Sequence, residues 1–137
     1  MGLLLDHHEL KQCLIERGSR MHFSQGDFLF QRGDEVRGLF LILSGQVRLG
    51  LDGESSALPS RDLGPGAILG LPATLSDSPY SLTAQANAKT EVIYLARAAM
   101  LDILRTHSKL CLEVMNLLSE ELAETRNALA RIHRIRA

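Results

Sequence analysis

Short apolar segments that end at glycine-containing turns constrain the fold of this chain more than any other feature. Between Met21 and Leu95 the apolar residues come in short runs or alternate with polar residues, as they do in strands. Helical periodicity is confined to the two ends of the chain. Many short strands with glycine turns, flanked by helices, indicate a β-barrel or a β-roll. The expected strands are 28–30, 39–43, 47–51, 67–69, 80–86 and 91–95, with an edge strand or loop over 54–61.

Glycines stand at the predicted corners of this arrangement. Gly33 and Gly45 lie in the turns on either side of the apolar segment 39–43, and Asp52-Gly53 is a strong hairpin signal. Glycine adopts a positive φ, at which the Cβ of another residue would clash with the backbone. We therefore expect Gly33 and Gly45 to have a structural role at tight corners.

The segment 64–86 combines a turn, a strand, a helical turn, a second turn and a strand. Gly64-Pro65-Gly66 form the first turn, and the apolar residues 67–69 follow. Pro72 suits the first position of a helix, so residues 71–75 can make about one helical turn. Free N–H groups at such a helix start can hold an anion. A loop that only packs on a sheet would have the same pattern, so both interpretations remain open.

Helices are expected over 6–17, over 97–105 and, without any Gly or Pro, over 109–136. The last of these has apolar residues at alternating steps of four and three, the a/d spacing of a coiled coil. This pattern predicts a dimerisation helix, and the alternative is a single helix buried in its own domain. Leu110 and Val114 lie on a neighbouring face that could pack on the roll. The predicted dimer seam consists of Cys111, Met115, Leu118, Leu122, Thr125, Leu129 and Ile132.

Composition excludes several function classes. The net charge of −1 and the absence of Trp argue against a basic surface or a stacking platform for nucleic acid. Two cysteines, Cys13 and Cys111, fit a reducing compartment better than a disulfide framework. The histidines lack metal-binding spacing, and no run approaches membrane length. We expect a cytoplasmic protein with no metal site, no membrane segment and no catalytic nucleophile–base pair or carboxylate dyad.

Two segments carry a resemblance to a known family. Residues 26–34 read GDFLFQRGD and residues 39–47 read LFLILSGQV. This order resembles the β-roll signature of cyclic-nucleotide-binding domains, and is most similar to the sensor half of the CRP/FNR transcription regulators. The resemblance implies a mainly β fold with flanking helices. It would be a β-roll (a double-stranded β-helix, or cupin-like jelly roll) followed by a long C-terminal dimerisation helix. Within one domain, the roll and N-terminal helix would cover 1–108 and the dimerisation helix 109–137.

The resemblance also implies that 64–86 is the family's phosphate-binding cassette. In the family, a Glu directly after the cassette Gly holds the ribose hydroxyl, and an Arg before a Ser or Thr pairs with the cyclic phosphate. This chain has Leu71 and Tyr80 at those two positions, so both charged anchors are replaced. Pro72 also removes one N–H from the helix start. The candidate ligand-binding residues are Gly70, Leu71, Pro72, Ala73, Thr74, Tyr80, Ser81 and Thr125, the last matching the family's central-helix residue that reaches the purine.

The function expected from these residues is that of a non-enzymatic, dimeric signal-sensing domain that does not bind cyclic AMP in the usual way. Any effector would be another small molecule, with no cofactor required. The chain stops at Ala137, before a helix-turn-helix module could follow, so no direct DNA binding is expected. A free-standing domain and an excised sensor half both fit. The first alternative is a ligand-free dimerisation module that pairs with DNA-binding family members. A haem gas sensor with His22 or His107 as axial ligand is the second.

Overall fold

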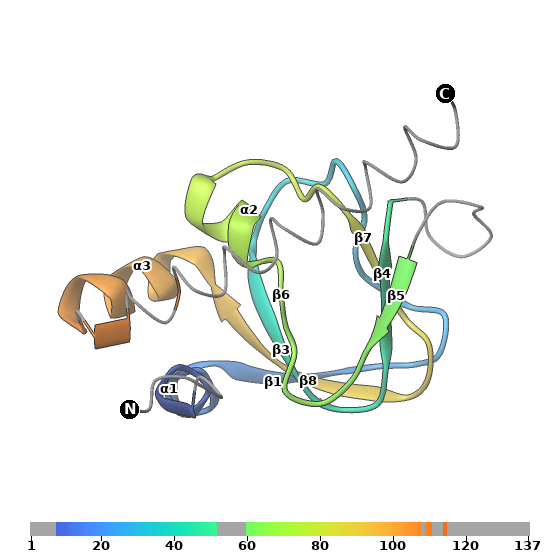
Figure 1. Cartoon of the computed structure of the whole chain (residues 1–137), viewed down its shortest axis with the longest axis horizontal. Coiled ribbons are helices and arrows are strands. Elements are labelled where there is room, and N and C mark those ends of the chain that lie inside the picture. The colour runs from blue at the N-terminus through green and yellow to red at the C-terminus, as the bar shows by residue number, and fades with distance from the viewer. Residues whose placement is uncertain (1–7, 52–59, 108, 111–113, 115–137) are drawn as a thin grey trace.

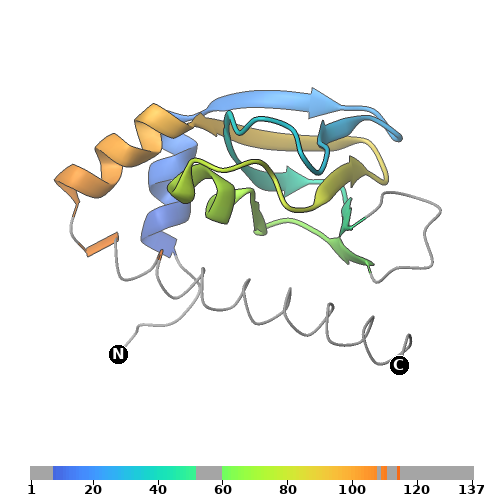
Figure 2. The same cartoon turned by 90° about the horizontal axis from the view of Figure 1, so that it is seen from above.

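Two antiparallel four-stranded sheets face each other in a roll (Figures 1 and 2). The structure, a computed structural model, describes residues 8–51, 60–107, 109–110 and 114. Its helices and strands are, in chain order, α1 (His8–Arg17), β1 (Ser19–Phe23), β2 (Phe28–Phe30), β3 (Gly38–Ser44), β4 (Val47–Gly50), β5 (Ser60–Leu63), β6 (Ile68–Leu69), α2 (Leu71–Ser76), β7 (Thr83–Ala86), β8 (Thr90–Ala96) and α3 (Arg97–Thr106).

The chain crosses between the sheets several times. One sheet has the strand order β1-β8-β3-β6 and the other β2-β7-β4-β5, with antiparallel pairing throughout. β3 leads into β4 of the opposite sheet through the Gly45 turn, and β7 leads back to β8. The predicted mainly β roll with flanking helices is therefore confirmed. β5 lies at the edge of its sheet. Of the segment 54–61, expected to be an edge strand or loop, the structure describes only residues 60 and 61, and both belong to β5.

The two central strands of the first sheet are buried on both faces. Along β3, Leu39 and Leu41 belong to the core on the helix side, whereas Phe40 and Ile42 belong to the core between the sheets. The side chains of β8 alternate in the same way, and Ile93 belongs to the core on the helix side. Burial on both faces explains why these strands are continuous apolar runs rather than alternating ones.

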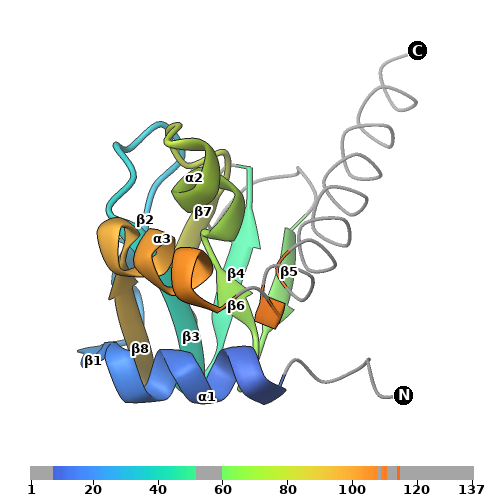
Figure 3. The same cartoon turned by 90° about the vertical axis from the view of Figure 1, so that its left-hand side faces the viewer.

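The helices α1, α2 and α3 lie at the same end of the roll (Figure 3). Leu10 and Leu14, one turn apart on α1, are almost fully buried against the first sheet. Leu110 and Val114 join the same core, so this apolar face packs on the roll as its spacing suggested. Among the described residues, no helix is long and apolar enough to cross a membrane.

Positive φ angles at the corner glycines confirm their predicted structural role. Gly33 has a φ of +93° and Gly45 a φ of +95°. Gly45 is also crowded, because a Cβ there would contact the carbonyl oxygen of Lys89 and lie 2.6 Å from the Cα of Thr90. At Gly33, by contrast, no described residue beyond its two chain neighbours has an atom within 4 Å of such a Cβ. The two corners therefore need glycine for partly different reasons.

The structure corrects one predicted strand and adds another. Residues 80–86 do not form a continuous strand, because β7 begins only at Thr83. The backbone of Tyr80 instead forms hydrogen bonds with the loop before β3. These bonds turn the chain at Tyr80. β1 has mostly exposed residues and an apolar pattern too weak to have been delimited from sequence. It is held by its pairing with β8.

Several expectations concern residues outside the described part of the chain. They include the Asp6 start of the first helix, the Asp52-Gly53 hairpin, and the C-terminal helix beyond Val114. The dimer seam falls there as well, with Cys111, Met115, Leu118, Leu122, Thr125, Leu129 and Ile132. These expectations stay predictions.

Candidate functional site

The first part of the cassette, up to the end of α2, has the local structure expected for it. β6 ends at Leu69, Gly70 has a φ of +82° and a ψ of 10°, and α2 begins at Leu71 with Pro72 in its first turn. The hydroxyl of Thr74 donates a hydrogen bond of 2.7 Å to the carbonyl oxygen of Gly70, which reinforces the start of this helix. The helical turn was predicted from Pro72, whereas the positive φ of Gly70 was not.

The residues of α2 that were candidates for ligand contact face the protein core. Leu71 is fully buried and belongs to the apolar core on the helix side, together with Leu10 and Met100. Ala73 and Thr74 are buried as well, whereas Pro72 is half-buried. At the position where the family resemblance implies a ribose-binding Glu, this chain therefore has a core leucine.

Tyr80 is the second buried replacement. Only 4% of the residue is exposed, and its ring stacks on Phe30 with centroids 3.9 Å apart and planes inclined by 10°. The Tyr80 hydroxyl donates a 2.6 Å hydrogen bond to the carbonyl oxygen of Gly38. It also accepts from the backbone N–H groups of Arg37 and Gly38, each at 3.3 Å. The hydroxyl thus has both donor and acceptor contacts within the protein.

The Tyr80 ring lies directly against the start of α2. A Cβ built at Gly70 would be 3.1 Å from Cε1 of Tyr80 and 3.2 Å from the carbonyl oxygen of Gly38. Gly70 therefore serves two needs, because its positive φ suits glycine and its neighbours leave little room for a side chain. The aromatic ring fills the space beside Gly70 at the helix start.

The backbone of Tyr80, like its side chain, forms hydrogen bonds with another part of the chain, in this case the β2–β3 loop. Its N–H donates to the carbonyl oxygen of Asp34 at 3.1 Å, and its carbonyl oxygen accepts from the N–H of Gly33 at 2.8 Å. Three residues further on, the side-chain hydroxyl of Thr83 accepts from the N–H of Arg32 at 3.0 Å. Ser81, the remaining candidate on this segment, is exposed. The loop, Tyr80 and β7 form one connected unit.

Arg97 connects the cassette to α3, and sequence reasoning did not single it out. Its Nε donates a 2.8 Å hydrogen bond to the carbonyl oxygen of Thr74, and lies 3.7 Å from Oδ1 of Asp77. Its backbone N–H donates to the carbonyl oxygen of Arg37 at 3.0 Å. One residue at the start of α3 therefore holds both the end of α2 and the β2–β3 loop. No periodic pattern in the sequence marks such a contact.

Tyr94 completes the aromatic cluster on this side of the roll. Its ring packs on Phe40 at a centroid distance of 5.3 Å, and its hydroxyl donates to the carbonyl oxygen of Arg37 at 3.1 Å. Partial burial, helped by the neighbouring Tyr80, raises the pKa of Tyr94, and the Arg37 guanidinium opposes this shift. The Tyr94 hydroxyl is therefore protonated at physiological pH and can donate this hydrogen bond.

The remaining candidates do not come together with the cassette in the described part of the chain. Thr125 lies outside the described residues. His22 is largely exposed on β1, with Nε2 3.9 Å from Glu91 Oε2. Within residues 8–51 and 60–107 and the few described beyond them, no group of three or more His, Cys, Asp or Glu is arranged to hold a metal ion.

The fold and the cassette together define a β-roll domain of the kind that regulators use. The sequence profile of the cyclic nucleotide-binding domain matches residues 20–107, so the chain belongs to the cyclic nucleotide-binding domain family. It is 32% identical over 108 residues to the cyclic AMP receptor protein of Thermus thermophilus, a match that covers 77% of this chain and 49% of the relative. The chain thus spans about half the length of that curated relative.

Solved structures share the fold. The catabolite activator protein of Thermus thermophilus superposes with a TM-score of 0.74 at 27% identity, over 96% of this chain and 61% of the other. The sensor domain of the transcriptional regulator DNR from Pseudomonas aeruginosa gives a TM-score of 0.67 at 16% identity, over 90% of this chain and 95% of that domain. The expected resemblance to regulators of CRP type is confirmed.

Proposed function

We propose that this chain is the sensor domain of a CRP/FNR-type regulator whose cassette is closed by its own side chains and does not bind cyclic AMP in the usual way. The observation that carries the proposal is the buried position of Tyr80, stacked on Phe30 and hydrogen-bonded to Gly38. The domain would act without enzymatic activity, in the cytoplasm, and without contacting DNA itself.

The chemistry of the two replaced anchors supports this proposal. A cyclic nucleotide brings a negative phosphate and a ribose hydroxyl, and Leu71 and Tyr80 offer neither a cation nor a carboxylate to them. Each lost charge-assisted contact costs about 1.5–3 kcal/mol of binding. Two such losses amount to roughly 3–6 kcal/mol, or about two to four powers of ten in affinity.

Packing adds to this loss. A phosphate at the start of α2 would need the Tyr80 ring to leave Gly70 and Phe30, which would break the stacking and the hydrogen bond to Gly38. Each of these two contacts contributes about 1 kcal/mol. Pro72 leaves one N–H fewer at the helix start, and α2 has only 6 residues. The cassette would therefore favour its own tyrosine over an anion.

Calorimetry with cyclic AMP and cyclic GMP tests the proposal. We expect no saturable binding to the wild-type chain below about 1 mM, in line with the loss of two to four decades. The matched variant Tyr80→Arg removes the ring and restores a cation, and should gain at least about tenfold in affinity. Leu71 is kept, because a carboxylate at this fully buried position would destabilise the roll. Micromolar binding by the wild type would contradict the closed cassette. No gain in affinity would contradict it as well, provided that thermal unfolding shows Tyr80→Arg to be folded with a cation at this buried position.

The second candidate function is a ligand-free dimerisation module that pairs with DNA-binding family members. The observation that favours it is the filled cassette, because the Tyr80 ring lies against Gly70 and stacks on Phe30 where a ligand would otherwise lie. A thermal-shift panel of nucleotides and other effectors separates the two functions, since a ligand of the native state raises the melting temperature. Stabilisation by any effector favours the sensor. Co-purification with a full-length regulator, without any such response, favours the pairing module.

A further inference from the structure

One peptide unit, between Arg37 and Gly38, connects the Tyr80 hydroxyl to the start of α3. Its N–H group, which belongs to Gly38, donates to the Tyr80 hydroxyl at 3.3 Å. Its carbonyl oxygen, which belongs to Arg37, accepts from the backbone N–H of Arg97, the first residue of α3, at 3.0 Å. The unit is trans and planar, so these two groups point in opposite directions and can only turn together. A displacement of Tyr80 therefore acts on the hydrogen bond that holds the start of α3.

This peptide unit has little room to turn independently of β8. Gly38 pairs with Ala96, the residue directly before α3. A Cβ built at Gly38 would contact the carbonyl oxygen of Leu95 and lie 2.9 Å from the Cα of Ala96, so the close approach of the two strands depends on glycine. The Tyr94 hydroxyl donates to the same Arg37 carbonyl oxygen at 3.1 Å. The peptide unit and the start of α3 therefore form one tightly packed junction.

The cassette helix α2 belongs to the same set of contacts. The Arg97 side chain donates to the carbonyl oxygen of Thr74 near the end of α2. At the other end of α2, the Tyr80 ring lies beside Gly70. The contacts thus run from α2 to Tyr80, to the peptide unit, to Arg97 and back to α2. Hydrogen bonds arranged in such a chain polarise and strengthen one another, so the loss of one weakens the others.

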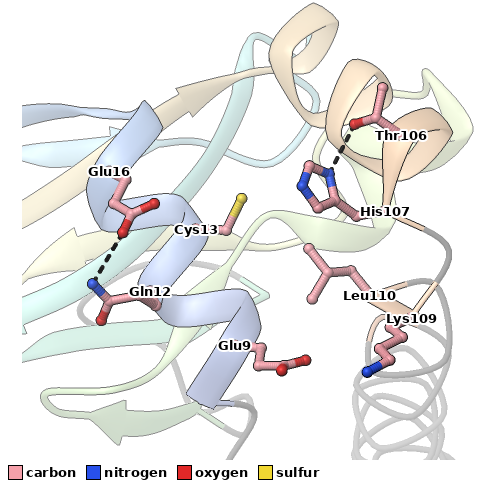
Figure 4. A pocket seen from close by; sticks show the side chains of 8 residues that line it. All are labelled: Glu9, Gln12, Cys13, Glu16, Thr106, His107, Lys109 and Leu110. Carbon is pink, nitrogen blue, oxygen red and sulfur yellow. Dashed lines mark hydrogen bonds between the residues drawn. The ribbon is translucent and has the colours of Figure 1, made fainter.

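The far end of α3 lies beside α1. The helix has 10 residues, a length of about 15 Å, and its last turn is closed by a 2.9 Å hydrogen bond from the N–H of His107 to Ile103. Thr106 and His107 line a cleft of about 520 Å³, with α1 on its opposite side (Figure 4). The ion pair between Asp102 and Arg17 of α1 is exposed and contributes little. The orientation of α3 therefore depends on its start and on its buried side chains.

We propose that Tyr80 takes the place of an effector and holds the start of α3 in every folded molecule. A side chain that belongs to the chain is always present at its site, whereas the occupancy of a free ligand depends on its concentration. The position of α3 is then set by folding, and the domain is a constitutive module rather than a switch. This inference rests on the proposed function in one respect only, the closed cassette.

Amide hydrogen exchange of the ¹⁵N-labelled full chain tests this role, with Tyr80→Phe as the variant. Gly38 loses the acceptor of its N–H and should exchange about tenfold faster or more. Arg97 does not contact Tyr80, but its N–H should exchange at least about threefold faster because the shared peptide unit is loosened. The N–H of Gly66 donates to Ile42 elsewhere in the roll and reports any general loss of stability. A change at Arg97 no larger than that at Gly66 would overturn the proposal.

Thr83→Val is the matched control on the same loop. The Thr83 hydroxyl accepts from the N–H of Arg32, so this variant also removes one side-chain acceptor from a backbone donor. It should speed exchange at Arg32 and leave Arg97 unchanged. Equal effects of Thr83→Val and Tyr80→Phe on Arg97 would show a general loosening of the loop, and would contradict a connection through the peptide unit.

Chemical rescue separates the hydroxyl from the ring. Tyr80→Ala removes a buried side chain and leaves a cavity of its shape. Added 4-methylphenol, which carries the same phenol group, should restore slow exchange at Gly38 and Arg97 in a saturable way. Toluene fills the same space without a hydroxyl and should restore it less, so equal rescue would overturn the proposal. If Tyr80→Ala does not fold, the comparison of Tyr80→Phe with Thr83→Val decides the question.

The exchange experiment and the nucleotide titration fail in different ways. Micromolar cyclic AMP binding by the wild type would contradict the closed cassette, whatever the exchange rates are. Unchanged exchange at Arg97 in Tyr80→Phe would contradict the role of Tyr80 in holding α3, even where no nucleotide binds.

Discussion

The Tyr80 hydroxyl donates a 2.6 Å hydrogen bond to the carbonyl oxygen of Gly38, 42 residues earlier in the chain. The bond is buried, and it fastens the segment after α2 to the first residue of the central strand β3. The same hydroxyl accepts from the N–H groups of Arg37 and Gly38. Tyr80 therefore contributes to the stability of the roll at the position where the family resemblance implies a ligand contact.

Replacing the tyrosine hydroxyl tests this structural role. Tyr80→Phe keeps the stacking on Phe30 but leaves the buried backbone groups of Gly38 without their partner, which should destabilise the fold by about 1–3 kcal/mol. Tyr94→Phe is the matched control, because its hydrogen bond to Arg37 is exposed, and it should cost less than about 1 kcal/mol. Urea unfolding measures both. Equal losses of unfolding free energy in the two variants would show that the buried hydrogen bond contributes no more to stability than the exposed one.

The corner at Gly45 should tolerate no side chain. Gly45→Val combines a positive φ with contacts to Lys89 and Thr90, and should cost roughly 2 kcal/mol or more. Gly33→Val has almost the same φ but free space around the Cβ, so it should show the conformational cost alone, about 1–2 kcal/mol. Thermal unfolding of the two variants separates crowding from backbone strain. A smaller effect at Gly45 than at Gly33 would contradict this explanation.

Arg97 should stabilise the contact between the cassette helix and α3. Arg97→Gln removes the cation that reaches Thr74 and Asp77, and we expect a loss of about 1–2 kcal/mol. Arg48→Gln removes an exposed ion pair with Asp62, which should contribute less than about 1 kcal/mol. Hydrogen exchange of the α2 amides should also speed up in the first variant only. Unchanged exchange in α2 would argue against a link through this arginine.

The dimer remains a prediction from the sequence alone. Leu122 lies on the a/d seam, and burying such a side chain contributes about 1.5–3 kcal/mol, so Leu122→Lys should give monomers. Asn127→Lys adds a positive charge outside the seam and should leave the dimer intact. Multi-angle light scattering reads out both variants. A monomeric wild-type chain would remove the coiled-coil interpretation.

Local patterns in the sequence determined most of the roll. The apolar runs 28–30, 39–43 and 91–95 are strands, the turns between them contain glycines with positive φ, and Pro72 begins a helical turn. These features depend on φ preferences and on side-chain alternation within a few residues, both of which are visible in the chain itself. The family resemblance was visible for the same reason, because its signature consists of these turns and strands.

Only the tertiary structure decided what the cassette residues do. A helix of 6 residues has too little periodicity to show which side faces the core, so Leu71 could not be distinguished from a ligand-facing residue. The orientation of Tyr80 depends on Phe30 and Gly38, which are distant in sequence and meet it only in the folded roll. The same holds for β1, whose polar residues form a strand through pairing with β8, and for Arg97, whose side chain bonds to Thr74 of another helix. Burial and long-range hydrogen bonds are properties of the packed chain, and no local pattern encodes them.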